Sequence, residues 1–412
     1  MRLMLNAGWR LLIGAGLCGA VLLSAARPAG AQVNARLLLV SGSAVPGHPG
    51  FTFGPFRDLS MSGNDQVVFR STLESPRNNL HAVVRSQGVS FSVVAFEGLI
   101  SPAAREQYES FSAPSINSAG AVAFRATLKA DAAGKPTQAI VRVQGASANL
   151  VADNGGGGGS SLGQIFKTFS APVIGSKGEV LFAARTGGAS PQSGLYLWSD
   201  QGMRSVELPK DFHLSPGQIL EPLFASHDEA VFVKSGVDMA AAREQFFRAV
   251  AVRNFQQLDP APKPEDTVKV LAARPNQKPV QLLLVLLQGD QAETAELAGD
   301  PSQAVMAQTG GVAAPASESS FASIQGQAAG RRSGSIIFAG VPSGQPDGFG
   351  LFCFCGGHVM RLTTQADFGL LLNNLSSKPI SSFAGDGQGT VALVAPVGAQ
   401  PGANAIFVCN TP

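Results

Sequence analysis

Short apolar triplets recur along the chain at nearly constant spacing, and each ends on a Phe or a Leu. They are Val67–Phe69, Val122–Phe124, Val180–Phe182, Ala230–Phe232, Gln281–Leu283, Ile336–Phe338 and Val391–Leu393. Successive triplets lie 50 to 58 residues apart, with a mean of 54. Self-similarity at such a period is typical of repeat architectures, in which each repeat is one supersecondary unit. Seven units of this length fill residues 32–412.

A second column of apolar residues lies thirteen residues before the last residue of each triplet. Its members are Phe56, Phe111, Phe169, Ile219, Val270, Gln325 and Ile380, of which only Gln325 is polar. Phe-Ser-Ala-Pro starts at both Phe111 and Phe169, and Ile219–Pro222 is a looser copy. A tight turn rich in Gly, Asn or Asp, such as Asn117–Gly120, separates the two columns. Further apolar stretches such as Gly194–Trp198 follow each triplet, so the pattern predicts four strands in each unit.

The second strand of a unit is apolar on both of its faces. Val122 and Phe124 would point to one side and Ala123 to the other. A strand buried on both faces lies in a sheet packed between two others. Four-stranded sheets stacked around an axis are the blades of a β-propeller, so we expect an all-β, seven-bladed β-propeller of four-stranded antiparallel blades. A linear solenoid is the alternative, but the polar end caps that solenoids need are not visible.

The two ends of this region favour closure of the propeller. The seventh unit stops after its third strand, Asn404–Cys409, and an unpartnered strand, Arg36–Val40, opens the region. We expect this N-terminal strand to pair beside Ala405–Cys409 as the outer strand of the last blade, with Leu37, Leu38 and Leu39 buried there. Such pairing removes two exposed strand edges.

The first 31 residues have the order of a secretory signal peptide. Arg2 and Arg10 supply positive charge, Leu11–Ser24 is mostly apolar, and Ala29–Ala31 is a small-residue cleavage pattern. We therefore predict cleavage after Ala31, one propeller domain over residues 32–412, and a secreted or periplasmic protein. An uncleaved membrane anchor is the alternative, but the apolar run is shorter than the roughly 20 residues that span a bilayer.

Composition and charge exclude several classes of protein and partner. The chain is 45% hydrophobic and 14% charged, which excludes a disordered protein, a collagen and a coiled coil. Loss of Arg2, Arg10 and Arg27 on cleavage would change the formal net charge from +2 to −1. We expect no nucleic-acid partner and no membrane insertion after cleavage, because the mature chain lacks clustered Lys and Arg. We also expect a monomer.

Three cysteines remain after cleavage: Cys353, Cys355 and Cys409. An odd number cannot pair fully, and three cysteines do not make a disulfide framework. We interpret them as small apolar core residues, with a bridge involving Cys409 as the alternative. No second pair or histidine stands at ligand spacing, so we expect no metal site.

The remaining chemical motifs carry weak signals. None of His48, His81, His213, His227 and His358 lies in a zinc-peptidase motif. Gly155–Gly159 is a glycine-rich candidate for a phosphate loop but leads into a strand. Ser161 lies in a G-x-S-x-G without a following helix. Trp198–Gly202 reads as an ordinary turn after the third strand. The sequence therefore assigns no catalytic, cofactor-binding or metal-ligating residue, and no cofactor.

One repeat carries a known motif. Asn117–Phe124 reads N-S-A-G-A-V-A-F and matches N-x-x-G-x-x-A-F in full, whereas the third unit has Gly175 for Asn and Leu181 for Ala. This resembles the bacterial secreted proteins known as choice-of-anchor tandem-repeat NxxGxxAF-containing proteins. The resemblance implies a propeller-like protein of unassigned activity with structural motif residues. The chain ends at Cys409–Pro412 without an apolar anchor, so we expect a free protein.

Loop lengths suggest which side of the propeller acts. Turns between first and second strands are short and define a short-turn face, whereas loops joining the blades are long, such as Gly98–Ser110 and Asn154–Lys167, and define a long-loop face. Elaborated loops on a rigid scaffold are common binding sites. We therefore predict a non-catalytic module that binds or scaffolds an unknown protein or glycan through the long-loop face. The alternatives are a glycan hydrolase or lyase with its site at the channel mouth on that face, and a TolB-like periplasmic partner protein.

Overall fold

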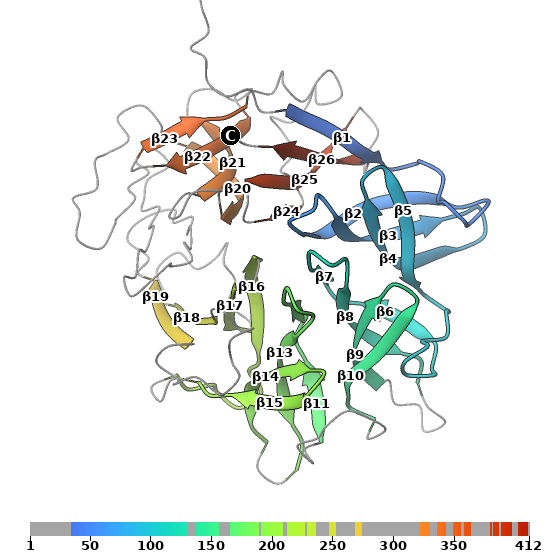
Figure 1. Ribbon diagram of the computed structural model, residues 1–412, viewed down its shortest axis with the longest axis vertical. Helices are drawn as coiled ribbons and strands as arrows, with labels where there is room; N and C mark the ends of the chain where they lie inside the picture. The colour runs from blue at the N-terminus through green and yellow to red at the C-terminus, as the bar shows by residue number, and fades with distance from the viewer. Residues whose placement is uncertain are drawn as a thin grey trace, which may run out of the picture. The chain divides into compact units, whose positions relative to one another are not determined.

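The strands of the protein form six antiparallel sheets in the part of the chain that the structure describes (Figure 1). The structure is a computed structural model, and it describes residues 34–130, 137–155, 165–188, 191–208, 212–226, 229–235, 247–252, 268–273, 321–329, 336–342, 349–355, 358–363, 380, 382–386, 389–397 and 403–410. The chain divides into two compact units, Met1–Gly30 and Ala31–Pro412, and all of these residues belong to the second. Within them, no helix is long and apolar enough to cross a membrane. The predicted signal peptide and the triplet Gln281–Leu283 lie outside them.

Each sheet except the terminal one is a meander whose strands follow chain order. The first sheet holds β2 (Thr52–Met61), β3 (Val67–Glu74), β4 (Asn79–Gln87) and β5 (Ser90–Phe96). The second holds β6 (Tyr108–Phe111), β7 (Ser115–Ile116), β8 (Val122–Leu128), β9 (Thr137–Gln144) and β10 (Ser147–Asp153). The third holds β11 (Phe166–Phe169), β12 (Val173–Ile174), β13 (Val180–Thr186), β14 (Ser193–Ser199) and β15 (Gly202–Val206).

Three further sheets complete the described fold. The fourth holds β16 (Leu220–Ser226), β17 (Glu229–Lys234), β18 (Phe247–Val252) and β19 (Val268–Ala273). Another holds β20 (Phe321–Ala329), β21 (Ile336–Pro342), β22 (Gly350–Cys355) and β23 (His358–Arg361). The terminal sheet holds β24 (Ser382–Gly385), β25 (Thr390–Pro396), β26 (Asn404–Asn410) and β1 (Asn34–Val40). The predicted all-β fold of four-stranded antiparallel sheets is confirmed.

The apolar triplets form the centre of the sheets. All six triplets that the structure describes lie in second strands: β3, β8, β13, β17, β21 and β25. Phe124 of β8 packs with Val68 of the first sheet, whereas Ala123 on its other face packs with Phe182 of the third. Both faces of the second strand are therefore buried, as predicted. Meander sheets that pack on one another in chain order are the building blocks of a β-propeller.

The same face-to-face packing links the remaining sheets. The partners are Leu197 with Phe232 between the third and fourth sheets, Leu351 with Phe407 between the β20–β23 sheet and the terminal sheet, and Ile406 with Phe69 between the terminal sheet and the first. The terminal sheet thus packs against the first sheet, although their second strands are separated by most of the chain.

The recurring Ser-Ala-Pro interrupts the first strand of the second and third sheets. Proline has no N–H to donate to a neighbouring strand. The Ser170 hydroxyl accepts a hydrogen bond of 2.9 Å from the Ala183 amide of β13, and the Ser112 hydroxyl accepts one of 3.0 Å from the Arg125 amide of β8. The serine hydroxyl thus replaces a ladder bond that the broken strand cannot supply.

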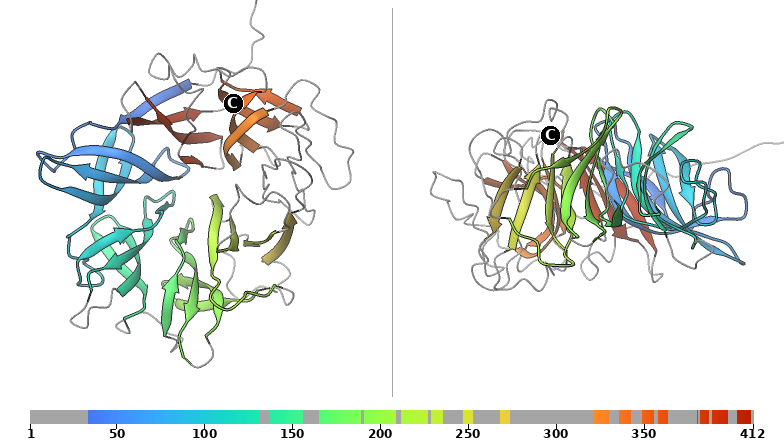
Figure 2. Two further views of the ribbon diagram at one scale, coloured as in Figure 1. Left: turned by 180° about the vertical axis from the view of Figure 1, so that it is seen from behind. Right: turned by 90° about the horizontal axis from the view of Figure 1, so that it is seen from below.

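The N-terminal strand belongs to the terminal sheet, as predicted. β1 pairs antiparallel with β26, Arg36 lying opposite Val408 and Val40 opposite Ala405, and the two strands lie side by side in Figure 2. The expected burial of all three leucines is wrong. Leu39 is 8% exposed, whereas Leu37 is 41% exposed, because the register shifts between them and turns Leu37 outward.

Three assignments in the column that precedes the triplets are also wrong. Ile324, not Gln325, lies opposite Gly340, the second residue after the triplet Ile336–Phe338. Val270 lies in β19 opposite Val250, so it belongs to the outer strand of the fourth sheet rather than to a first strand. Leu220, not Ile219, occupies the place of Phe169, since each lies opposite the second residue after the triplet, Lys234 or Ala184. The physical reason is that loop length varies between units, so a fixed offset does not follow the register.

The interpretation as small apolar core residues is confirmed for Cys409 but is incomplete for Cys353. Cys353 is disulfide-bonded rather than a free core residue, and the side chain of Cys355 lies outside the described residues. Cys409 is a free, buried thiol, so the suggested bridge through it is wrong. Burial raises the pKa of the Cys409 thiol to about 12.

Cys409 should resist modification in the folded protein. Thiolates are the reactive species, and burial suppresses both ionisation and access. We expect an aromatic disulfide reagent at about pH 8, near the ordinary cysteine pKa of about 8.5, to spare Cys409 until guanidinium chloride unfolds the chain. Mass spectrometry of the Cys409 peptide measures this. Equal labelling rates with and without denaturant would contradict the buried position.

Candidate functional site

The structure brings no histidine into a recognisable reaction centre among the residues that it describes. The His48 ring packs edge-on against Phe96, with ring centroids 5.3 Å apart, and His81 and His213 are exposed. His227 and the side chain of His358 lie outside the described residues. Within the described ranges, no group of three or more His, Cys, Asp or Glu residues is arranged to hold a metal ion.

The other weak motifs are placed only in part. Ser161 lies outside the described residues, as does Gly155–Gly159 except for its first glycine. Trp198–Gly202 does form a turn after the third strand, since β14 ends at Ser199 and β15 begins at Gly202. This turn also forms one wall of a cavity.

The motif asparagine joins neighbouring sheets. The Asn117 side chain is 5% exposed, and its Oδ1 accepts hydrogen bonds from the amides of Ala119 (3.1 Å) and Ala121 (2.9 Å). Its Nδ2 donates to the Gly175 carbonyl of the third sheet at 2.8 Å. Gly120 has a φ of +76°, a conformation that favours glycine. The motif residues thus build a turn and dock it on the next sheet, which is a structural role.

Arginines make a second set of links between neighbouring sheets. Arg70 follows the first triplet and donates to the Phe111 carbonyl of the second sheet at 2.7 Å. Arg125 follows the second triplet and donates to the Phe169 carbonyl of the third sheet. Arg70 also pairs with Asp58 of the neighbouring strand β2. An arginine directly after the triplet therefore links each of these two sheets to the first strand of the following sheet.

Two half-buried groups of opposite charge interact electrostatically near the second of these links. The fourth sheet carries Glu221, whose pKa burial raises, while Arg125 and a backbone hydrogen bond from Ala171 partly oppose that shift. Burial lowers the pKa of Arg125, Glu221 opposes this shift, and nearby Arg70 adds to it. The Arg125 and Glu221 charges therefore act on the pKa of each other. Glu221 is the described carboxylate with a clearly raised pKa.

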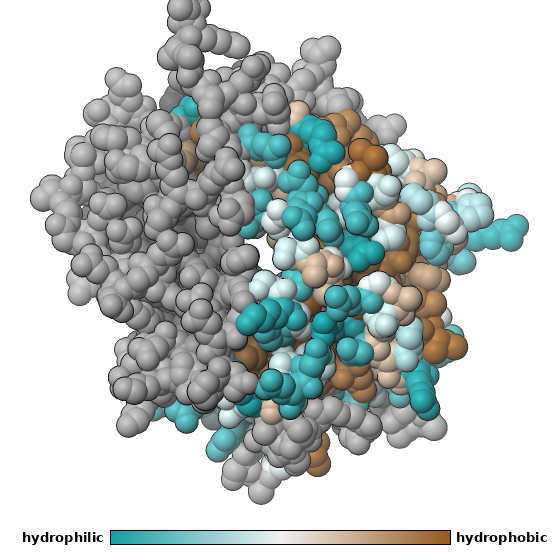
Figure 3. Space-filling model, in the orientation of Figure 1, coloured by the Kyte–Doolittle hydropathy of each residue, from teal (hydrophilic) through white to brown (hydrophobic). Residues whose placement is uncertain are grey.

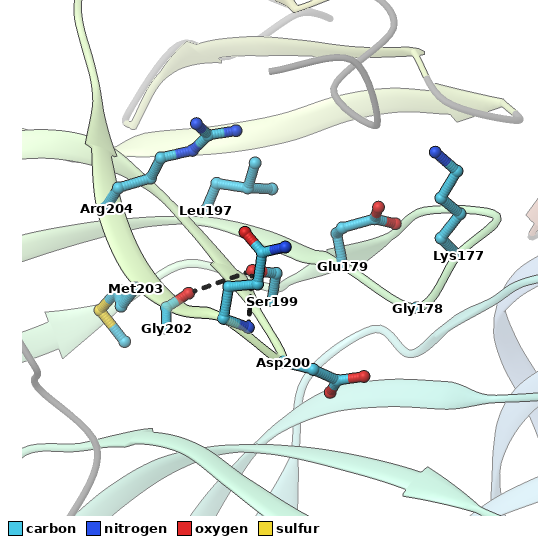
Figure 4. Close-up of a pocket in the computed structure, with 10 residues that line it drawn as sticks. Lys177, Gly178, Glu179, Leu197, Ser199, Asp200, Gly202, Met203 and Arg204 are labelled. Atoms are coloured by element: carbon cyan, nitrogen blue, oxygen red, sulfur yellow. Dashed lines mark hydrogen bonds between the residues drawn. The ribbon is translucent and has the colours of Figure 1, made fainter. Parts of the chain in front are cut away.

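A cavity of about 490 Å³ opens at the short-turn face of the third sheet (Figure 4). Its walls are the turn from β12 to β13 and the turn from β14 to β15, and its lining includes Lys177, Glu179, Leu197, Gln201 and Arg204. Lys177, Glu179, Leu197 and Arg204 extend to the same side of the sheet, whereas Asp200 points away. Leu197 belongs to the face of the third sheet that packs on the fourth.

Arg142 of the second sheet holds both walls of this cavity. Its Nη1 lies 3.1 Å from Asp200 Oδ1, and its guanidinium lies 5.5 Å from the Trp198 ring centroid. Gly178 has a φ of +92°, and a Cβ added there would lie 2.5 Å from Arg142 Nη2. The positive φ of Gly178 favours glycine at this position, and the Arg142 guanidinium lies close against both turns.

Sequence reasoning missed the cavity residues. Glu179 occupies the position that Ala121 holds in the second unit, directly before a buried triplet. A charged residue in that column was a usable signal. Lys177 and Arg204, in contrast, come from different turns, and nothing in their spacing predicts that they line the same cavity.

The long-loop face carries two exposed isoleucines. Ile100 is 59% exposed and Ile165 is 68% exposed. Ile100 is bridged to Gln107, whose carbonyl accepts from the Lys129 amide at 2.8 Å. The Ile165 carbonyl accepts from the corresponding amide of the third sheet, that of Gly187, at 2.6 Å. The two isoleucines therefore lie at matching heights on neighbouring sheets.

Hydrophilic residues gather over much of the described surface shown in Figure 3.

Comparisons with known proteins give remote likenesses. No curated protein matches the chain. The β-propeller domain of the Trilobed protease from Pyrococcus furiosus is 9% identical, with a TM-score of 0.46, over 87% of this chain and 93% of that domain. Pyrococcus horikoshii acylaminoacyl peptidase is 11% identical, with a TM-score of 0.44, over 86% of this chain but 51% of the peptidase.

A third likeness and a family match complete the comparison. A protein of unknown function from Dyadobacter fermentans is 9% identical, with a TM-score of 0.37, over 92% of this chain and 100% of that chain. TM-scores below 0.5 carry no argument about function. Residues 28–141 match the model of a family of unknown function, DUF7453.

Proposed function

We propose that the protein is a secreted or periplasmic, monomeric β-propeller of the NxxGxxAF-repeat kind that binds a protein or glycan without catalysis. Seven blades are supported by the seven triplets and by residues 274–320, a stretch close in length to one repeat between the fourth sheet and β20. Closure is supported by the pairing of β1 with β26. The partner binds to the long-loop face.

The observation that carries this proposal is the pair of exposed isoleucines on the long-loop face. A large apolar side chain gains most when a partner covers it. Ile100 and Ile165 project from consecutive loops that backbone hydrogen bonds fix to the second and third sheets. A rigid scaffold with apolar anchors on its loops suits recognition of a partner surface.

A glycan hydrolase is the second candidate, and Glu221 is the residue that favours it. Its raised pKa is a property of general acids. Most glycosidases, however, need a second carboxylate on the other side of the scissile bond. The charged residue that faces Glu221 in the described part of the chain is Arg125, which supports a structural charge pair rather than an acid–base pair.

The proposal is tested with glycan arrays and purified peptidoglycan as probes. We expect the protein to bind at least one of them, and the double variant Ile100→Ser/Ile165→Ser to bind at least about tenfold more weakly. Fully covering one such side chain is worth about 1.5–3 kcal/mol. Fluorescence on the array and pull-down with peptidoglycan measure the change.

Val89→Ser is the matched control. Val89 is 79% exposed, and it lies in the β4–β5 turn on the short-turn face. Its loss should leave binding unchanged. A double isoleucine variant that binds as well as the parent, or a Val89 variant that loses binding, would refute the assignment of the long-loop face.

A further inference from the structure

We infer that the cavity on the short-turn face of the third sheet binds a small zwitterion, of the size of a free amino acid or a dipeptide. This site is separate from the partner surface proposed above, because the two lie at opposite ends of the strands. The inference rests on three features of the cavity: an unpartnered carboxylate, two unpaired cations beside it, and walls that the neighbouring sheet holds in place.

The carboxylate of Glu179 lacks a partner. Its Oε2 is buried and accepts no hydrogen bond. Two ion pairs are described, Arg70–Asp58 and Arg142–Asp200, and neither involves Glu179. A buried carboxylate oxygen is unfavourable unless a donor reaches it. Glu179 lines the cavity. Rotation of its carboxylate into the cavity would let a donor on a bound ligand, above all an ammonium group, satisfy this oxygen.

Lys177 and Arg204 supply the opposite charge. Both line the same cavity as Glu179, and both extend to the same side of the sheet in Figure 4. Neither belongs to the two described ion pairs. Arginine binds a carboxylate through two parallel hydrogen bonds, and lysine adds a point charge. A ligand that carries both an ammonium and a carboxylate therefore matches the charges on the cavity wall.

The walls hold these groups in place before a ligand arrives. Arg142 donates to Gln144 Oε1 at 2.8 Å, pairs with Asp200 and lies over Trp198. Asp200 also lines the cavity, but its carboxylate is paired with Arg142 and points away from Lys177 and Glu179 in Figure 4. Glu179 is therefore the lining carboxylate without an ion pair among the described residues. Fixed walls reduce the ordering cost of binding.

The size of the cavity limits the ligand. A volume of about 490 Å³ lies within the range of ordinary small-molecule sites of about 300–1,000 Å³. Leu197 supplies an apolar surface next to the charged groups. A dipeptide with one apolar side chain fits this combination of charges, volume and apolar contact.

The experiment is isothermal titration calorimetry of the full chain with glycyl-L-leucine. We expect saturable binding in the millimolar range or tighter. N-acetyl-glycyl-leucine lacks the ammonium and glycyl-leucinamide lacks the carboxylate, so each should bind at least about tenfold more weakly. The variants Glu179→Gln and Arg204→Gln should lose a similar factor toward the uncapped dipeptide.

Glu109→Gln is the matched control, because Glu109 is an exposed glutamate of β6 that does not line the cavity. It should leave the affinity unchanged. Glu179→Gln should also melt at the parent temperature or above it, because the carboxylate that it removes has no partner. A marked fall in that temperature would show a structural role and overturn the inference.

Two other results would overturn it: no binding of glycyl-L-leucine at millimolar concentration, or equal binding of the capped and uncapped dipeptides. Neither result affects the proposed partner surface, since Ile100 and Ile165 are absent from this cavity.

Discussion

Deletion of residues 32–40 is expected to lower the melting temperature by on the order of 10 °C or to cause aggregation. β1 forms the outer edge of the terminal sheet, where it pairs with β26 from Asn34 to Val40. Each lost ladder bond costs about 0.5–1.5 kcal/mol, and the lost burial of Leu39 costs about 1.5–3 kcal/mol. The total is comparable to the roughly 5–15 kcal/mol that stabilises a typical domain.

Calorimetry and size-exclusion chromatography measure this effect, and two point variants provide its control. Leu39→Ser should destabilise the protein by about 2–5 kcal/mol, since Leu39 is 8% exposed in the core shared with the first sheet. Leu37→Ser should cost under about 1 kcal/mol, since Leu37 is 41% exposed. A truncated protein that stays monomeric and melts within about 2 °C of the parent would exclude closure through β1.

The second large effect is expected at Asn117. Asn117→Ala removes two bonds accepted from the Ala119 and Ala121 amides and the bond donated to the Gly175 carbonyl. It leaves the buried Ala121 amide without its partner, and the Gly175 carbonyl keeps only the bond from the Gly178 amide. We therefore expect a loss of about 2–4 kcal/mol in the free energy of unfolding. Urea denaturation followed by circular dichroism measures the loss.

The matched control is Asn64→Ala. Asn64 also links neighbouring sheets, through a bond of 2.8 Å from its Nδ2 to the Ser118 carbonyl, but this bond is exposed. Water can replace it, so the variant should lose under about 1 kcal/mol. Equal losses for the two asparagines would mean that burial of the Asn117 side chain contributes nothing.

The fold was largely predictable because its strongest signal is local. A second strand that is buried on both faces must be apolar throughout, so the triplets remain recognisable although their neighbours vary. Strand order within each sheet followed from the turns, and the place of β1 followed from counting strands in the last unit. These inferences need only hydrophobic pattern and turn chemistry.

Register and orientation were not predictable in the same way. A one-residue shift reverses the direction of every side chain, and the shift between Leu37 and Leu39 has no mark in a run of three leucines. Val270 was assigned to the wrong strand because an apolar strand does not reveal its place in the sheet. Only the pairing with Val250 fixes it.

The candidate site was predictable even less. Glu179 and Arg204 line one cavity because two turns of one sheet stand side by side, and Arg142 from another sheet contacts both turns. Neither turn contains a sequence motif whose residue spacing is typical of a binding or catalytic site. The absence of a partner for Glu179 Oε2 is a property of packing, which no linear pattern encodes.

The pairing of β1 with β26 has a consequence for the order in which the chain assembles. Ser41 and Asn404, which are joined by a hydrogen bond of 3.0 Å at this seam, are 363 residues apart. Bringing such distant segments together costs only about 2 kcal/mol more than closing a loop the length of one repeat. The larger effect is on the folding rate, because contacts between residues this distant in sequence form slowly. β1 is synthesised long before β26, and its pairing edge stays unpaired until β26 has formed.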